Sequence, residues 1–401
     1  MHALISGASI AGPVLAYWLR RHGWQVTVVE RTSALRAGDG GHAVDLFGPA
    51  VEVIERMGLL DRVSAARTRN DTITLFRPGG RAPISLATAD LVTGIADRHI
   101  EIMRGTLAGF LHDATRDEVD YRFGTVIEQL DGTTAVLSDG STVDADLVAG
   151  ADGLHSGVRG LAFGPERRYR QFLGAYLAVY SLPDVLDTGP TVAAFTAPGR
   201  AATVYPVAPG RSRALFLVRT PHEVTYDRRD PAAQKAVLRE LVGEAFGARL
   251  GAVLSCLDAA GDFYLDDISQ IRMDSWSRGR VTLVGDAGYG PGPAVGGGTS
   301  LAVAGAYVLA AELGGAPAAE IPAALARYQA MLSEPVRHGH RIGPAVLGSI
   351  VPRNRAQVWA TAQAMRLLPR LPRPLRSRLT SFGGGPAAML DGLTLPPAPA
   401  A

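Results

Sequence analysis

The residues Gly7, Ser9, Ile10, Ala11 and Gly12 have the types and spacing of a phosphate-binding turn. They follow the short apolar run 3–6, which predicts a strand, and they precede a predicted helix over 13–21. Gly7 permits a tight turn, and Gly12 lets the helix pack close to the strand. Free N–H groups at such a helix N-terminus attract a pyrophosphate. Ser9 stands where this fingerprint commonly has its middle glycine, which weakens the pattern.

The next predicted strand, 25–30, ends at Glu30. A carboxylate at this position accepts hydrogen bonds from the ribose hydroxyls of an adenosine. Arg31 follows directly and is included among the cofactor-binding candidates. The whole unit is a strand, helix and strand of about 30 residues, so it predicts an adenine dinucleotide site. On its own it leaves open whether the ligand is FAD or NAD.

A second stretch whose residues could take part in chemistry lies at 280–313. Val281–Val284 predicts a buried strand, residues 285–298 are too rich in Gly and Pro for a regular element, and a long Ala/Leu/Val helix is predicted from Thr299. The N–H groups and dipole of that helix point at the loop and favour an anion or an electron-rich group. A plain strand–helix unit with a linker is the alternative if this stretch is taken alone.

The composition limits the classes of protein that these motifs could belong to. The chain has 401 residues, 47% hydrophobic and 19% charged, with a net charge of +2, which fits a soluble globular enzyme and excludes a nucleic-acid-binding polyelectrolyte. Cys256 is the only cysteine, so an intrachain disulfide and a cysteine metal cluster are excluded. No apolar run is long enough for stable membrane insertion. We expect a cytoplasmic protein.

Several titratable residues between these motifs have an ordinary explanation. His42 and Asp45 could form a catalytic pair, but local hydrogen bonding in a glycine-rich loop is the favoured interpretation. Arg104 lies where a predicted strand enters a helix, so it faces either a cofactor or the surface. Residues 119–145 predict four short strands in an antiparallel excursion, after which Asp152-Gly153 forms another tight turn.

Residues 170–263 alternate in hydrophobicity and predict a mostly antiparallel sheet with a helix over 231–246. No fingerprint lies in this region, so we assign it to substrate binding. Tyr205, Arg213 and Phe216 are on predicted strands and could face a substrate or point away from it. Beyond residue 313 we expect helices over 321–333 and 353–368 and a disordered end.

Three motifs now stand in a fixed order: Gly7–Gly12 with Glu30, Asp152-Gly153 with Arg159, and Gly285-Asp286 with the Pro/Gly loop. From Met1 to about Glu334 the chain resembles the FAD-dependent aromatic hydroxylases, single-component flavoprotein monooxygenases built like p-hydroxybenzoate hydroxylase. It is most similar to the branch that acts on polycyclic and antibiotic-like molecules, including the tetracycline-inactivating monooxygenases.

The resemblance implies an α/β fold in which a glutathione-reductase-like FAD-binding βαβ domain is interleaved with a mostly antiparallel substrate sheet, followed by C-terminal helices. The FAD domain would comprise residues 1–70, 96–170 and 264–330, and the substrate domain 71–95 and 171–263. Residues 331–401 would form a helical segment with a flexible tail.

The resemblance also implies roles for individual residues. Glu30 would bind the adenosine ribose, Arg104 the FAD, and Asp286 the ribityl or ribose chain, while Asp152 would serve both FAD and NAD(P)H. Val44 and Asp45 would approach one side of the flavin ring. The segment with Pro293, Gly296, Gly298, Thr299 and Ser300 would lie against the ring, with the helix N-terminus at its N1 edge.

The implied reaction is hydroxylation of an aromatic or polyketide-like small molecule. NADPH or NADH would reduce FAD as a transient donor, and O2 would form a flavin C4a-hydroperoxide, so no metal or catalytic side chain need make the oxidant. Such an enzyme would serve secondary metabolism or antibiotic modification. The same site would also suit Baeyer–Villiger insertion, epoxidation or oxidation, and a non-enzymatic FAD- or ligand-binding protein is a third possibility. The substrate and the oligomeric state stay open.

Overall fold

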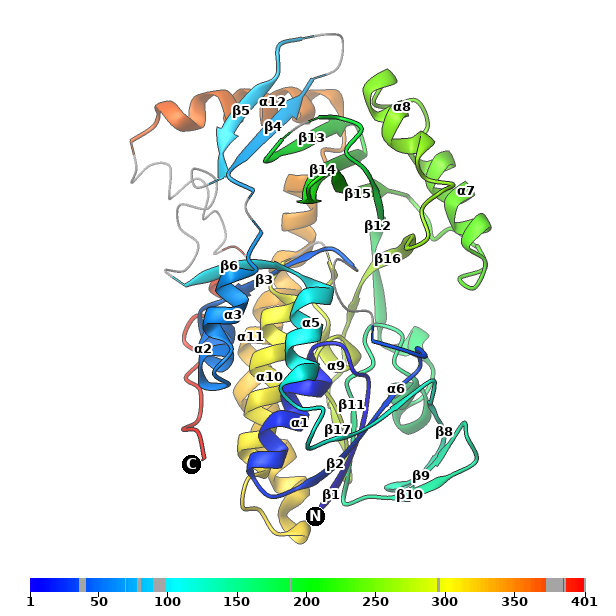
Figure 1. The fold of residues 1–401 in the computed structure, drawn as a ribbon, viewed down its shortest axis with the longest axis vertical. Coiled ribbons are helices and arrows are strands. Elements are labelled where there is room, and N and C mark those ends of the chain that lie inside the picture. Colours follow the sequence, from blue (N-terminus) through cyan, green and yellow to red (C-terminus); the bar gives the residue numbers. More distant parts are fainter. Residues whose placement is uncertain are drawn as a thin grey trace.

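The structure is a computed structural model that describes residues 1–35, 41–68, 70–77, 81–88, 98–187, 189–293, 296–372, 385 and 387–399. It has a lower unit built on one sheet and an upper unit built on another, with a two-stranded ribbon between them (Figure 1). The fold is the α/β arrangement expected from the sequence, with a parallel FAD-binding sheet, an antiparallel substrate sheet and C-terminal helices.

The lower sheet has six strands in the order β17-β18-β11-β1-β2-β7. All neighbours except β17 and β18 run parallel. The central strands β1 and β11 are buried over nearly their whole length because both faces of the sheet are covered. The bounds are β1 (His2–Ser6), β2 (Gln25–Glu30), β7 (Asp120–Phe123), β11 (Leu147–Gly150), β17 (Ser277–Arg278) and β18 (Val281–Leu283).

Helices pack on one face of this sheet, and a small sheet packs on the other. The first face carries α1 (Ala11–Arg21), α2 (Gly48–Arg56), α3 (Leu60–Ala65), α5 (Arg104–Asp113), α9 (Asp286–Tyr289) and α10 (Gly298–Leu313). The second carries β8 (Ile127–Asp131), β9 (Thr134–Leu137), β10 (Thr142–Asp144) and α6 (Gly157–Phe163). The predicted four-stranded excursion is therefore wrong in one strand, since β7 pairs in parallel with β2 as the sheet edge.

The upper sheet has seven strands in the order β16-β12-β15-β14-β13-β4-β5, and only β13 and β4 are parallel. Its bounds are β4 (Thr72–Phe76), β5 (Ile84–Ala87), β12 (Arg170–Pro183), β13 (Thr191–Ala197), β14 (Arg200–Ala208), β15 (Arg211–Arg219) and β16 (Tyr264–Ile271). Helices α7 (Pro231–Val242) and α8 (Ala248–Ser255) cover its outer face. The division into domains stays a prediction, but β16 pairs with β12, so this sheet extends past residue 263.

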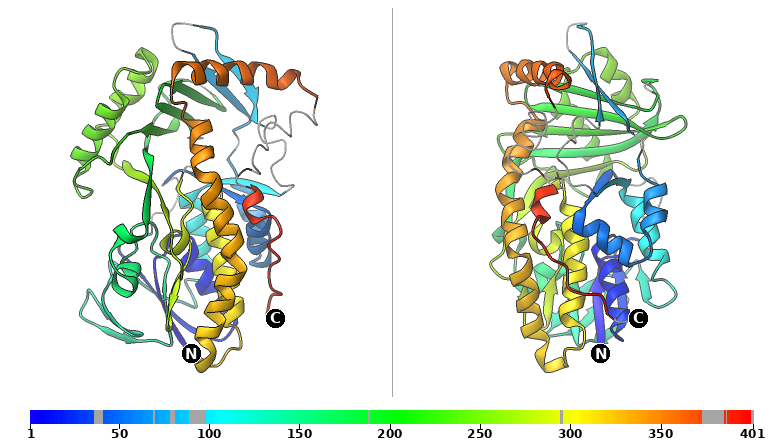
Figure 2. Two further views of the ribbon diagram at one scale, coloured as in Figure 1. Left: turned by 180° about the vertical axis from the view of Figure 1, so that it is seen from behind. Right: turned by 90° about the vertical axis from the view of Figure 1, so that its left-hand side faces the viewer.

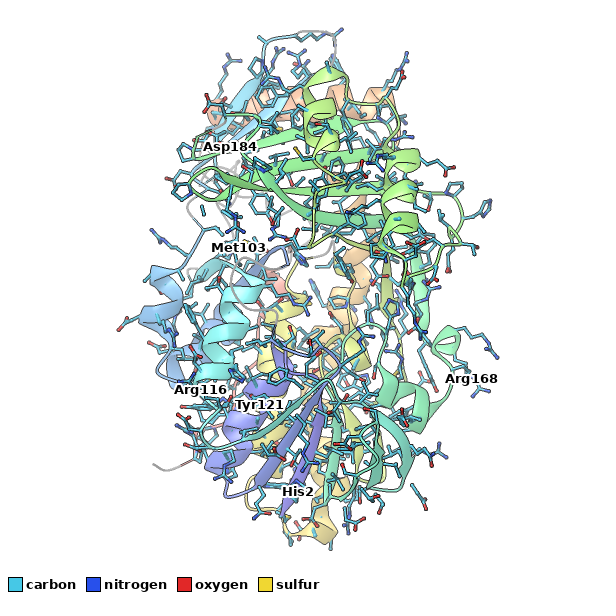
Figure 3. The ribbon with its side chains drawn as sticks, turned by 45° about the vertical axis from the view of Figure 1, so that its right-hand side comes forward. His2, Met103, Arg116, Tyr121, Arg168 and Asp184 are labelled. Atoms are coloured by element: carbon cyan, nitrogen blue, oxygen red, sulfur yellow. The ribbon has the colours of Figure 1, made fainter. Side chains whose placement is uncertain are left out.

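The ribbon of β3 (Ala43–Phe47) and β6 (His99–Met103) lies between the two units. Met103, at the end of β6, lies between His2 at the lower end and Asp184, which follows β12 in the upper unit (Figure 3). Val44 and Leu46 pack downward into the helical core of the lower unit. Alternation along the strand then turns Asp45 toward the opposite face.

Helix α11 (Ile321–Ile350) runs along the back of the molecule and reaches the upper sheet, where Leu347 packs (Figure 2). We predicted that this helix ends near Ser333, before Pro335, but the helix continues through Pro335 and Pro344. Helix α12 (Arg355–Leu367) follows as expected.

The C-terminal tail differs from the prediction of disorder. The described residues 387–399 pack against the lower unit, as the right-hand view of Figure 2 shows. Leu395 is buried, and the carbonyl of Pro396 accepts hydrogen bonds from Arg56 and Tyr307. None of the described helices is long and apolar enough to cross a bilayer.

Gly305 lies where α10 packs closely against Tyr289 and Leu332. A Cβ at this position would lie 2.2 Å from the Oη of Tyr289 and 3.2 Å from Leu332. Tyr289 cannot move away freely, because Tyr328 donates a hydrogen bond to its hydroxyl over 2.9 Å. We predict that Gly305→Ala lowers the free energy of unfolding by about 1–3 kcal/mol in urea titrations.

The matched control is Gly251→Ala in α8, where a Cβ would meet nothing within 4 Å. This exposed helical site should gain about 0.5–1 kcal/mol, since alanine is the better helix former. Equal effects at the two positions would mean that α10 is not tightly packed here.

Candidate active site

The turn between β1 and α1 is tightly packed. Gly7 has a φ of +109°, and a Cβ there would lie 2.4 Å from the carbonyl oxygen of Ala151. A Cβ on Gly12 would lie 1.9 Å from the carbonyl oxygen of Gly7. Neither position accepts a side chain. The N-terminal N–H groups of α1 therefore lie at the end of a close-packed turn, as a pyrophosphate site requires.

Arg104 connects this turn to the ribbon. Its Nε and Nη2 donate to Ser9 Oγ over 3.3 and 3.0 Å, and its backbone N–H donates to the carbonyl of His42. Burial raises the pKa of Asp286, and the nearby guanidinium of Arg104 offsets part of this effect. Ser9, the apparent weak point of the fingerprint, thus holds a cation beside the predicted phosphate site.

Two of the predicted acidic residues have local partners. Glu30 accepts hydrogen bonds from the N–H of Ala8 at 3.0 Å and from the N–H of Thr32 at 2.9 Å. Asp152 caps α6 by accepting from the N–H groups of Gly157 and Val158. Arg31 is exposed. The cofactor contacts of these residues stay predictions.

Asp286 differs because its carboxylate has no hydrogen-bond donor among the described residues. Its side chain is exposed although its chain neighbours are buried, and the protein packed around it raises the pKa of its carboxyl. An exposed carboxylate without a donor from the protein can accept hydrogen bonds from a ligand. The residues therefore fit a cofactor that brings hydroxyl groups, as the ribityl chain of FAD does.

The N-terminus of α10 faces the same region. Gly296 and Gly297 both have φ near +70°, at +71° and +72°, which turns the chain into the helix at Gly298. Ser300 is fully buried and its hydroxyl bonds β3, while its contact with the flavin stays a prediction. Pro293 and Thr299 adjoin this N-terminus, while residues 294 and 295 of the predicted ring-facing segment lie outside the described residues.

The ribbon residues do not all point where we expected. Val44 is buried in the lower core, whereas Asp45 bonds His99 over 2.7 Å and not His42. Among the described residues the His42 ring has no hydrogen-bond partner. Burial, with help from Arg104 and Arg213, lowers the pKa of His42 to about 4, so the ring is neutral near pH 7. Sequence reasoning missed this position of His42 between the two units.

The substrate candidates on the upper sheet lie on opposite faces of it, because side chains alternate along a strand. Tyr205 and Arg213 are register partners on the face opposite α7 and α8, and Ser181 is the next partner of Arg213. Tyr205 Oη accepts from the N–H of Ala43 over 3.2 Å, so this face meets the ribbon. Phe216 has the other parity and stacks on Tyr180 in the core beneath α7 and α8.

A family model described as the FAD binding domain matches residues 1–330. The chain belongs to this family, which includes the aromatic hydroxylases. A flavin-dependent monooxygenase from an unknown prokaryotic organism is 36% identical over 344 residues, covering 85% of this chain and 88% of that protein. An uncharacterised protein of Mycobacterium tuberculosis is 40% identical over 324 residues, covering 77% of this chain and 84% of the relative.

The crystal structure of the tetracycline destructase Tet(55) superposes with a TM-score of 0.80 at 32% identity and covers 98% of both chains. Together these likenesses make the protein a flavin-dependent monooxygenase that binds FAD.

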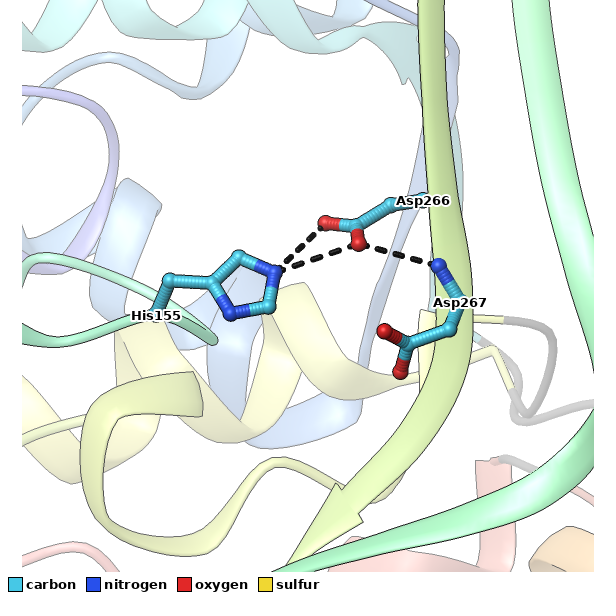
Figure 4. Close-up of side chains that lie close together, drawn as sticks. All are labelled: His155, Asp266 and Asp267. Carbon is cyan, nitrogen blue, oxygen red and sulfur yellow. Dashed lines mark hydrogen bonds and ion pairs between the residues drawn. The ribbon is translucent and has the colours of Figure 1, made fainter. Parts of the chain in front are cut away.

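A charged cluster outside the turn joins the two units of the monooxygenase (Figure 4). His155, in the loop before α6, contacts Asp266 on β16 at 3.0 Å and Glu166 at 3.0 Å. The ligand atoms of His155, Asp266 and Asp267 lie close enough together to hold a metal ion, but Arg228 already contacts both aspartates. A neutralised cluster of this kind is better explained as an ion-pair network than as a metal centre.

The first site prediction compares Asp286 with Glu30. Asp286→Ala should weaken FAD retention more than Glu30→Ala, because Glu30 already accepts local hydrogen bonds and Asp286 accepts none from the described residues. Loss of a charged hydrogen bond corresponds to about a tenfold or larger rise in the FAD dissociation constant. The measurement is flavin content after gel filtration, followed by FAD titration of the apoprotein. The opposite ranking would mean that Glu30 carries the main ribose contact.

The second site prediction concerns pH. Burial lowers the pKa of His155, but hydrogen bonds and charge from Asp266 and Glu166 outweigh it and raise the pKa to about 9. A raised folded-state pKa stabilises the fold fully below the unfolded value of 6.5, and the effect is lost as the pH rises through about 9.

Wild type should therefore exceed His155→Gln by about 1–2 kcal/mol in free energy of unfolding near pH 6, with the gap closing above about pH 9. Urea titrations across this range measure the gap. A gap that is constant with pH would show that His155 acts through packing alone.

Proposed function

We propose that the monooxygenase uses NADPH or NADH to insert one oxygen atom into an aromatic or polyketide-like small molecule. The observation that carries this proposal is the sheet face with Tyr205 and Arg213, which meets the ribbon beside His42 and Arg104. A substrate on that face would lie next to the region that suits the flavin. Aromatic and polar side chains together favour a planar molecule with hydroxyl or keto groups.

Bound FAD supplies the electron acceptor for the nicotinamide and the centre at which O2 is activated. The chain supplies binding and orientation. The turn at Gly7–Gly12, with Arg104 and Ser9, would hold the pyrophosphate, and Asp286 would accept hydrogen bonds from the ribityl chain. The N-terminal N–H groups of α10 would stabilise negative charge on the flavin. The upper sheet would limit the access of water to the site.

The likeness to a tetracycline destructase supports a polycyclic substrate and a role in antibiotic modification or secondary metabolism. Baeyer–Villiger insertion and epoxidation would use the same site and add the same oxygen atom. The nature of the product, and not the site, separates them.

The test follows NADPH and NADH oxidation by the FAD-loaded protein against a panel of phenolic polyketides, with tetracycline included. We predict that at least one polycyclic phenol stimulates oxidation, and that 18O2 labels the product. Product mass gives the number of oxygen atoms, and NMR places them on a ring carbon, in an epoxide or within an expanded ring.

Phe216→Leu is the control for this assay, since Phe216 lies on the covered face of the sheet and should leave the substrate preference unchanged. Arg213→Met should reduce the stimulation by about tenfold or more, because a charged hydrogen bond to the substrate would be lost. Stoichiometric H2O2 and no labelled product with every compound would contradict the proposed reaction.

A further inference from the structure

The C-terminal part of the sequence carries charge of one sign. Between Glu334 and Asp391 it contains nine arginines and no aspartate, glutamate or lysine. The whole chain has a net charge of only +2, so the rest of the molecule is acidic on balance. An asymmetry of this kind indicates a negatively charged partner for the basic part.

Helix α12 holds part of this charge at the surface. It lies across the upper end of the molecule, away from the lower unit (Figure 2). Its inner face packs Ala362 and Met365 against Leu75 of β4 and Ile84 of β5. Because these contacts fix the helix by one face, its other face is held toward solvent.

The outer face of α12 combines arginines with large apolar side chains. Arg355, Trp359 and Arg366 are spaced by four and seven residues, which places them on one side of the helix. Trp359 is 61% exposed, and Leu367, next to Arg366, is 52% exposed. These residues and the exposed arginines at the two ends of the helix form the α12 patch, which consists of Arg353, Arg355, Trp359, Arg366, Leu367 and Arg370.

The arginines of the α12 patch keep their charge unpaired. Within the described part of the chain none of the four forms an ion pair, whereas exposed arginines elsewhere do, such as Arg98 with Glu55 and Arg327 with Glu312. Nothing in the described residues therefore neutralises the patch, and its positive potential is available to a partner.

Trp359 gives the patch an apolar component that charge alone does not explain. The other tryptophans, Trp18, Trp24 and Trp276, are 3%, 0% and 3% exposed, so Trp359 is the exception. A tryptophan ring with its polar N–H is typical of the boundary between a membrane and water. Arginine suits the same boundary, because its stem lies along apolar surface while its guanidinium bonds phosphate.

Other partners fit the α12 patch less well. A second copy of the chain would bring like charges together in a two-fold contact. Nucleic acid calls for a broad basic surface, but the molecule outside residues 335–390 is acidic on balance. A bilayer that contains anionic lipids presents negative charge above apolar chains, which matches both components of the patch.

We propose that the α12 patch docks the protein on the surface of an anionic phospholipid bilayer. The arginines bind lipid phosphates, and Trp359 and Leu367 enter the interface between headgroups and acyl chains. The 13-residue helix lies in the plane of the interface and does not span it. Docking places the upper sheet nearest the bilayer. This proposal does not depend on the proposed function.

The experiment is flotation of the full-length, FAD-loaded protein with vesicles of phosphatidylcholine, alone or with one third phosphatidylglycerol. Wild type should float with the anionic vesicles at low salt and not with the neutral ones. Binding should be lost at 1 M salt, where the Debye length is about 3 Å. Arg355→Gln with Arg366→Gln should lower the partition coefficient by about tenfold or more, and Trp359→Ala by about fivefold.

The matched control is Arg116→Gln with Arg229→Gln, which changes the net charge equally at exposed arginines outside the patch. This variant should bind the anionic vesicles as wild type does. All of these side chains are exposed, and thermal unfolding checks that each variant is folded.

Tryptophan fluorescence supplies a second measurement, because the other three tryptophans are buried. Lipids brominated in their acyl chains quench only a ring that reaches the bilayer, so the quenching should disappear in Trp359→Ala. The proposal is overturned if wild type does not bind anionic vesicles or binds neutral ones equally. It is also overturned if the α12 double variant retains binding, or if the protein binds a single-stranded oligonucleotide and no vesicle.

Discussion

The free edge of strand β3 is the constraint on which the arrangement of the site depends. A two-stranded ribbon leaves one row of backbone groups unpaired, and a buried row of this kind must find partners. Ser300 supplies two bonds, accepting from the N–H of Phe47 and donating to the carbonyl of Asp45, and Tyr205 accepts from the N–H of Ala43. One edge thereby fixes the ribbon to the N-terminus of α10 and to the upper sheet.

Arg104 also links separate parts of the site, in this case through its charge. It is bonded to Ser9 in the turn, its backbone bonds His42 in the ribbon, and its field acts on Asp286 and Tyr264. A cation placed among the turn, the ribbon, α9 and β16 favours a ligand with negative charge and hydroxyl groups along its length. FAD has this distribution, and family membership agrees with it.

Structural features that depend on neighbouring residues in the sequence could be predicted. Features that depend on the register between strands could not. Gly7–Gly12 and 281–313 identify the strand–turn–helix units, because glycine spacing and apolar runs act within one segment. The faces of the sheet on which Tyr205 and Phe216 lie depend on strand parity. The C-terminal tail packs because Leu395 is buried in the core of the lower unit, among residues far away in sequence. We predicted that α11 ends before Pro335, but the helix continues, since packing outweighs the backbone hydrogen bond that proline removes.

The upper sheet separates stability from recognition by strand parity. Residues such as Phe216 and Tyr180 face α7 and α8, where a change of volume disturbs a close-packed core. Residues of the opposite parity include Leu177, Val179 and Leu217, which pack with Leu347 of α11, and Tyr205, which meets the ribbon. Arg213 has the same parity and donates to the carboxylate of Asp262. A side chain held by such a bond is oriented before a ligand arrives, which reduces the entropy lost on binding.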